Sequence, residues 1–113
     1  MQNQSNKRNH AVASAIVQCI LDNDCTLRHN YSGRGMYDRN CIGYMTDSPL
    51  KSLVSITSQI MESELSDSEK EHAVRILENA SMDNMGYSSI IYFSGLQWSE
   101  ELAEEYHRYI DED

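Results

Sequence analysis

Apolar residues recur at three- and four-residue spacing in four stretches of the chain, as in helices that bury one face. The spacing predicts helices over about 7–22, 49–63, 67–80 and 100–110. The apolar positions that define the four faces are Val12, Ile16, Cys19 and Ile20; Leu50, Leu53, Val54, Ile56, Ile60 and Met61; Ala73, Val74, Ile76, Leu77 and Ala80; and Leu102, Ala103, Tyr106 and Ile110.

Three of the helices begin at recognisable start signals. Ser48 precedes Pro49, and proline is tolerated at the first helical position because its missing N–H costs nothing there. Ser66 stands three residues before Glu69, which is the spacing of a capping box. Ser99 is the expected cap of the last helix.

Three shorter stretches have the pattern of β-strands. Cys25, Leu27, His29 and Tyr31 alternate with polar residues, which predicts a strand with one buried face. Residues 41–45 follow a long glycine-containing loop and would pair with the first strand as a hairpin. Residues 87–93 are so apolar that they predict a central strand covered on both faces, ended by Gly95.

The predicted order is therefore α-β-β-α-α-β-α. Three strands in this order cannot all be joined by parallel crossovers, so we expect an α+β fold in which about four helices pack on a small, mostly antiparallel three-stranded sheet. Residues 7–113 are expected to form one domain, with a frayed polar tail over 1–6. The stretch 81–86 is expected to be a loop in which Gly86 takes a left-handed conformation.

Charge divides the chain into two unlike halves. Of the 113 residues, 1–51 hold six Lys and Arg and four acids, for a net charge of +2, whereas 52–113 hold three bases and fourteen acids, for −11. The total is −9, and such an acidic chain is a poor candidate for direct binding of nucleic acid.

Several classes of protein are disfavoured by what the sequence lacks. There is no apolar run of about 18 residues to span a membrane, and the first ten residues lack the apolar centre of a signal peptide, so we expect a cytoplasmic protein. The odd count of three cysteines argues against a disulfide framework. No cofactor fingerprint and no nucleophile motif is present, so we expect neither a cofactor nor an enzyme activity.

The loop between the first two strands is the most unusual local feature. Gly33 and Gly35 bracket Arg34, and glycines let a backbone approach a ligand while an arginine binds an anion bidentately. The residues that would form this anion site are Arg28, Gly33, Arg34, Gly35, Tyr37 and Arg39. The alternative is a structural one, in which the glycines serve a long turn and the arginine is solvated.

The stretch YSGRGMYDRNCIGY, with the later DNMGYSSIIYF, resembles short uncharacterised proteins of bacteriophages and prophages. The resemblance implies a phage accessory protein and implies no activity. It marks residues 33–37 and Cys41 in the first stretch, and Asp83, Met85 and Gly86 in the second. Asp38 departs from the pattern, which has glycine there.

Acidic residues of the second half form a second candidate surface. Carboxylates spaced along helices can imitate DNA phosphates and occupy a basic groove of a nucleic-acid-binding host protein. The residues are Glu62, Glu64, Asp67, Glu69, Glu71, Glu100, Glu101, Glu104 and Glu105. The sequence alone favours the alternative of a solvated helix surface, since acidic residues in the first turn of a helix interact favourably with the macrodipole.

Other groups carry weaker hypotheses. Cys25, His29 and Cys41 lack the spacing of a zinc site, and a buried thiol pair beside a core histidine is the simpler interpretation. Tyr87, Tyr92, Phe93, Trp98 and Tyr106 are expected in the core, whereas Met82 and Met85 suit an adaptable contact surface for a partner or a homodimer. The sequence thus favours a protein-binding inhibitor of a host protein over a protein that sequesters a nucleotide or another small anion.

Overall fold

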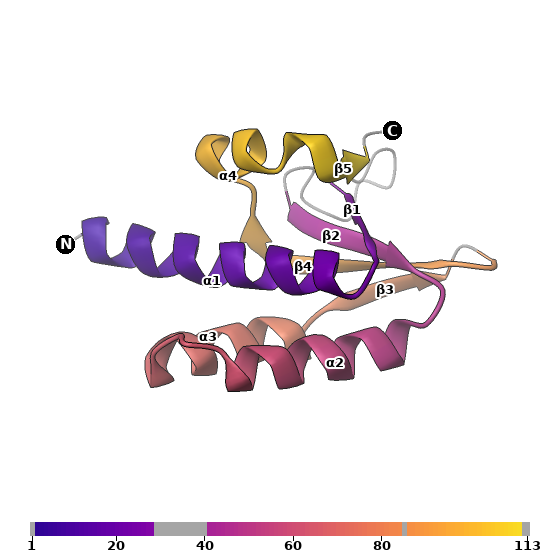
Figure 1. The fold of residues 1–113 in the computed structure, drawn as a ribbon, viewed down its shortest axis with the longest axis horizontal. Helices are drawn as coiled ribbons and strands as arrows, with labels where there is room; N and C mark the ends of the chain where they lie inside the picture. The colour runs from indigo at the N-terminus through magenta and orange to yellow at the C-terminus, as the bar shows by residue number, and fades with distance from the viewer. Residues whose placement is uncertain (1, 29–40, 85, 112–113) are drawn as a thin grey trace.

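The computed structural model describes residues 2–28, 41–84 and 86–111, and it shows an α+β fold (Figure 1). The order of the main elements is α-β-β-α-α-β-β-α, with four helices and four antiparallel strands. The elements are α1 (Gln2–Asp22), β1 (Thr26–Arg28), β2 (Cys41–Thr46), α2 (Pro49–Glu62), α3 (Asp67–Glu78), β3 (Ser81–Asn84), β4 (Ser89–Gln97), α4 (Glu100–Glu105), a 3-10 turn (His107–Tyr109) and β5 (Ile110–Asp111). Within the described ranges, no helix is both long and apolar enough to cross a membrane.

The sheet has the strand order β3-β4-β2-β1-β5, so β2 is its middle strand. The two-residue β5 joins the edge of β1 in parallel, and the other neighbours are antiparallel. The prediction of a mostly antiparallel sheet is confirmed, but the prediction of three strands is wrong. The residues expected to be a loop supply β3, which forms a hairpin with β4 and covers its outer edge, so β4 is paired on both sides, with β3 and with β2.

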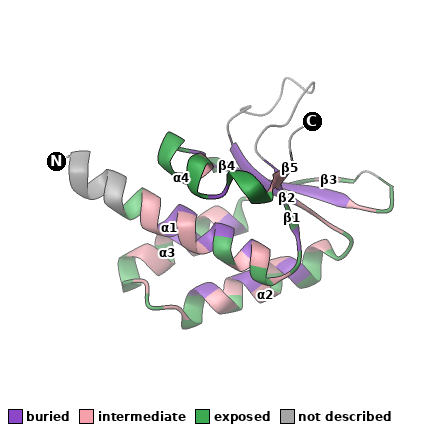
Figure 2. Ribbon diagram, turned by 45° about the horizontal axis from the view of Figure 1, so that its top comes forward, coloured by how far each residue is buried: buried purple, intermediate pink, exposed green. Residues whose placement is uncertain are grey.

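The main core lies between one face of the sheet and the helices. Ile42, Tyr44, Ile91 and Phe93 point from neighbouring strands into the same cluster as Ile16 of α1. α1 packs against both α2 and α3, and the buried faces of these helices turn toward one another (Figure 2). Burial of one face on every helix explains why the 3.6-residue periodicity predicted all four helices.

The opposite face of the sheet holds a smaller cluster of Cys41, Ile90 and Tyr92, with Met45 packed against it. Residues 89–93 are therefore buried on both faces, as their apolar run predicted. Gly95 does not end β4, because the strand continues to Gln97 through a register shift opposite Cys41 and Ile42.

The ends of the helices differ from the sequence pattern in three places. α1 includes residues 2–6, which the apolar periodicity leaves outside the helix. Ser48 makes no side-chain cap bond to α2, whereas Ser66 and Glu69 form the predicted capping box. α4 ends at Glu105, because Ile110 leaves the helical path to pair with Leu27 in β1.

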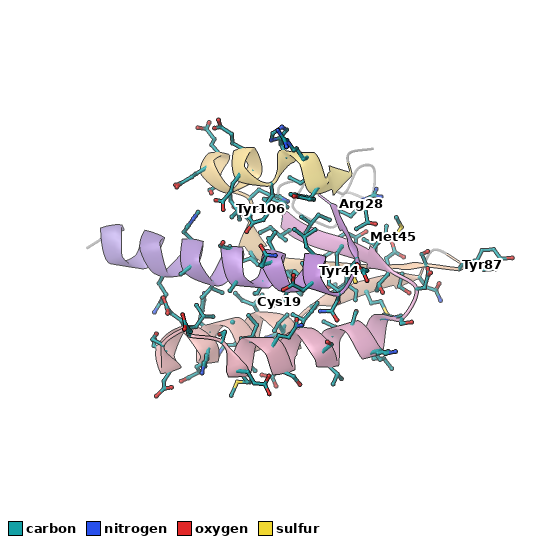
Figure 3. The ribbon with its side chains drawn as sticks, viewed as in Figure 1. Cys19, Arg28, Tyr44, Met45, Tyr87 and Tyr106 are labelled. Atoms are coloured by element: carbon teal, nitrogen blue, oxygen red, sulfur yellow. The ribbon has the colours of Figure 1, made fainter. Side chains whose placement is uncertain are left out.

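Hydrogen bonds hold α4 and the end of β4 to the first part of the chain. The Tyr106 hydroxyl of the α4 end donates to Gln18 of α1 at 3.4 Å. The Trp98 indole donates to the Arg28 carbonyl oxygen of β1 at 3.2 Å, and Trp98 and Tyr106 are buried as predicted. Tyr87 contradicts its predicted place in the core: it is 100% exposed at the β3–β4 hairpin and points away from the molecule (Figure 3).

Candidate partner-binding surfaces

The first acidic group, around the turn from α2 to α3, comprises Glu62, Glu64, Asp67, Glu69 and Glu71. All are exposed except Glu69, which is half-buried because its carboxylate accepts the Ser66 N–H at 2.8 Å in the capping box. Glu71 accepts from Arg75 at 3.0 Å, an exposed ion pair of small energetic weight. Within this group Glu69 thus has a structural role.

The second acidic group is carried by α4 and comprises Glu100, Glu101, Glu104 and Glu105, all exposed. These four carboxylates lie away from Leu102 and Tyr106, which face the core. The Ser99 hydroxyl caps the helix by accepting a hydrogen bond from the Leu102 N–H at 3.1 Å. The helix thus has one side packed on the core and the other side charged. No basic residue lies within α4.

The two acidic groups lie on different sides of the molecule. α4 lies on one side of α1 and the α2–α3 pair lies on the other (Figure 1). The sequence could not distinguish this arrangement from one continuous acidic face, because both groups lie 40 or more residues after α1. A partner that covers one group therefore does not automatically cover the other.

A cavity of about 450 Å³ opens between α2 and α3, and we call it the α2–α3 groove. It is lined by Met61, Asp67, Lys70, Glu71, Val74, Arg75 and Glu78. Met61 is 54% exposed and Val74 is half-buried, so apolar side chains lie in the groove and charged ones surround them. Two residues of the first acidic group, Asp67 and Glu71, thus border an apolar depression rather than an evenly polar surface.

The sequence pattern placed six apolar residues of α2 on one buried face, and half of that prediction is wrong. Ile56 and Ile60 are fully buried, but Leu50 is 72% exposed and Val54 is 67% exposed. We call Leu50, Val54 and Met61 the α2 stripe. The sequence held a signal of this exposure: the six apolar residues span a wider arc around the helix axis than packing against one neighbouring surface requires.

The glycine-arginine loop residues Gly33, Arg34, Gly35, Tyr37 and Arg39 lie outside the described residues, as does His29. Arg28 is described, and its position corrects the prediction of an exposed polar face on β1. Its side chain is 8% exposed, on the face of the sheet opposite Leu27. Arg28 is in register with Gly43 of β2, and Gly43 with Tyr92 of β4.

Two further cavities carry mainly groups that the sequence did not single out, together with Glu101 of the second acidic group. One, of about 710 Å³, lies between α1, α3 and the β4–α4 segment, and His10, His72 and Glu101 are among its lining residues. The other, of about 420 Å³, lies between the turn after α1, the end of β2 and the start of α2, and Asp24, Asp47 and Lys51 are among its lining residues. No sequence signal links His10 with His72, because only the packing of α3 beside α1 brings their helices together.

The cysteines do not form the predicted buried thiol pair. Cys25 belongs to the main core and Cys41 to the cluster on the other face of the sheet. Among the described residues, no group of three or more His, Cys, Asp and Glu is arranged to hold a metal ion. Burial, with a smaller contribution from Asp22, raises the pKa of Cys19 to about 11, so this thiol is protonated at neutral pH and a poor nucleophile.

Comparison with known proteins gave no match: no family model, curated protein or solved structure resembles the chain significantly.

Proposed function

We propose that this chain is a non-enzymatic protein that binds and inhibits a host protein, with its acidic helices imitating nucleic-acid phosphates. The resemblance of its glycine-arginine stretch to short phage proteins supports a phage origin, and a host defence protein that binds nucleic acid is the partner class that we favour. An acidic mimic would enter a basic groove and reach it rapidly by electrostatic steering.

The charge density of α4 is the observation that carries this proposal. Four exposed carboxylates fall within six residues, or about 9 Å of helix axis. This is about one charge per 2 Å, close to the one charge per roughly 1.7 Å of duplex DNA. The buried Leu102 and Tyr106 keep the charged side of this helix turned to solvent.

A displacement assay on immobilised DNA tests the proposal. DNA-binding proteins of a bacterial lysate are loaded on DNA-cellulose at low salt, and the purified chain is added as eluent. We expect it to displace at least one host protein, and the displacement to weaken as ionic strength rises.

Charge-reversal variants identify the surface. Glu104→Lys/Glu105→Lys should reduce displacement about tenfold, and lysines near a helix C-terminus favour the macrodipole, so the fold should persist. Glu62→Lys/Glu64→Lys reports on the other acidic group. Asp22→Lys/Asp47→Lys makes the same change in net charge outside both groups and should displace as well as wild type. Equal loss in all three variants, or no displacement by wild type at low salt, would sink the mimicry proposal.

Sequestration of a small anion by the glycine-arginine loop is the alternative function. The buried Arg28 favours it, because this residue directly precedes the loop and its carbonyl is anchored by Trp98. Calorimetry with nucleotides tests it: binding that Arg34→Ala abolishes would support sequestration, and no heat from any nucleotide would reject it.

A further inference from the structure

The α2 stripe is a row of apolar side chains that the fold leaves uncovered. Leu50, Val54 and Met61 are four and seven residues apart, so they lie on one side of α2. The row is about 16 Å long, or three helical turns. Its exposed fractions, 72%, 67% and 54%, are large for three aligned apolar residues.

This stripe is separate from the face of α2 that stabilises the fold. Ile56 and Ile60 point into the core, and the stripe lies about 120° further around the helix axis. Core packing therefore does not explain the apolar residues at these positions. At its Met61 end the stripe runs into the α2–α3 groove, where Val74 of α3 adds a second apolar wall.

The charges around this surface select the kind of partner that would cover it. The groove is lined by two bases, Lys70 and Arg75, and by three acids, Asp67, Glu71 and Glu78. The end of α2 and the turn after it add exposed Glu62 and Glu64, so the rim carries two basic and five acidic residues, a net charge of −3. A second copy of this chain would bring equal negative charge against it, which is unfavourable.

We propose that the α2 stripe and the α2–α3 groove form a docking site for an amphipathic helix of a partner protein, with apolar residues on one face and Lys or Arg beside them. Helix-in-groove recognition uses apolar anchors at i, i+3, i+4 and i+7 of the docked helix, and the stripe, at positions i, i+4 and i+11 of α2, is long enough to contact several such anchors. The proposal rests on the proposed function in that the partner is a protein with a basic surface. It adds the recognition element and places it on α2 and α3, away from α4.

A synthetic peptide tests this site without knowledge of the natural partner. The probe is a fluorescent leucine-lysine peptide of about five helical turns, with leucines at i, i+4, i+7 and i+11 and lysines elsewhere. Two control peptides carry the same residues in scrambled order, or glutamate in place of every lysine. Anisotropy should show saturable binding of the ordered lysine peptide and at least tenfold weaker binding of both controls.

Variants of the protein locate the binding. Leu50→Ser/Val54→Ser should weaken peptide binding at least tenfold, and circular dichroism should show an unchanged fold because both residues are exposed. Tyr87→Ser removes a fully exposed aromatic side chain from the β3–β4 hairpin and should bind like wild type. Asp67→Asn/Glu78→Gln should weaken binding and reduce its dependence on salt.

Several results would overturn the proposal. Equal binding of the ordered and scrambled peptides would do so, and so would full affinity in the Leu50→Ser/Val54→Ser variant. A wild-type dimer in sedimentation that this variant dissociates would show that a second copy of the chain occupies the site. Glu104→Lys/Glu105→Lys should not affect peptide binding. A failure of DNA displacement with intact peptide binding, or the reverse, therefore separates the mimicry proposal from the docking site.

Discussion

The hydroxyl of Tyr44 in β2 lies 2.8 Å from the hydroxyl of Ser52 in α2, and both side chains are buried. The Ser52 hydroxyl donates to the Pro49 carbonyl oxygen at 3.0 Å, so Tyr44 is the donor to Ser52. This chain of hydrogen bonds joins the middle strand to the first turn of the helix that carries the α2 stripe. It thereby positions the docking surface relative to the sheet.

Removing the Tyr44 hydroxyl tests that link. Tyr44→Phe leaves the ring in the core and deletes one buried hydrogen bond, so the free energy of unfolding should fall by about 1 kcal/mol. Urea denaturation measures the change. Tyr109→Phe alters a half-exposed ring and should stay within about 0.5 kcal/mol of wild type; equal effects of the two changes would contradict the role of the buried bond.

The same hydroxyl should make stability depend on pH in the alkaline range. Burial raises the pKa of Tyr44 from 10.0 to about 12, because the ionised form loses hydration. The folded state therefore holds this proton more tightly than the unfolded state does, so its contribution is complete below pH 10 and is lost as pH rises from about 10 to about 12.

Urea denaturation at a series of pH values checks this prediction. The unfolding free energy of wild type should fall more steeply above pH 10 than that of Tyr44→Phe, by at most about 1.4 kcal/mol per pH unit. Titration of Cys19 contributes equally to both proteins and cancels in the comparison. Parallel curves would show that Tyr44 titrates alike in the folded and unfolded states.

A glycine in the middle strand should tolerate no side chain. A Cβ at Gly43 would lie 2.6 Å from the Ile91 carbonyl oxygen of β4, so Gly43→Ala must push two paired strands apart. We expect a loss of about 1 to 3 kcal/mol in thermal or urea unfolding. Gly95→Ala is the matched control, since nothing lies within 4 Å of a Cβ there, and it should be nearly neutral.

Two serines that precede helices should differ in their effect on stability. Ser66 accepts the Glu69 N–H at 3.1 Å, so Ser66→Ala should cost about 1 kcal/mol. Ser48 makes no side-chain cap bond to α2, so Ser48→Ala should change the unfolding free energy by less than about 0.5 kcal/mol. This prediction would be contradicted if both substitutions left the unfolding free energy unchanged or lowered it equally.

The two apolar sides of α2 should respond differently to truncation. Ile60→Ala empties part of the core and should lower the unfolding free energy by about 2 to 5 kcal/mol. Val54→Ala trims an exposed side chain and should change it by less than about 0.5 kcal/mol. A large loss at Val54 would mean that the stripe belongs to the fold and not to a docking surface.

Local rules in the sequence determined much of this protein. The 3.6-residue periodicity predicted α1, α2, α3 and α4, because each helix buries a continuous face. The Ser66–Glu69 spacing predicted the capping box, and Gly86 has the positive φ of 94° expected of it. The paired strands β1 and β2 and the buried run of β4 were predicted as well, since alternation and apolar density are local properties of a chain.

Tertiary structure decided which apolar residues face inward and which charges share a surface. The short polar segment 81–84 becomes β3 only because β4 supplies its hydrogen bonds. Leu50, Val54 and Met61 are apolar like Ile56 and Ile60, but α1 and the sheet cover one side of α2 alone, so half of the six residues predicted as the buried face remain exposed. The acidic residues share one sign along the sequence, yet α1 divides them between two sides of the molecule, since the direction in which a helix packs depends on contacts far apart in the chain (Figure 1).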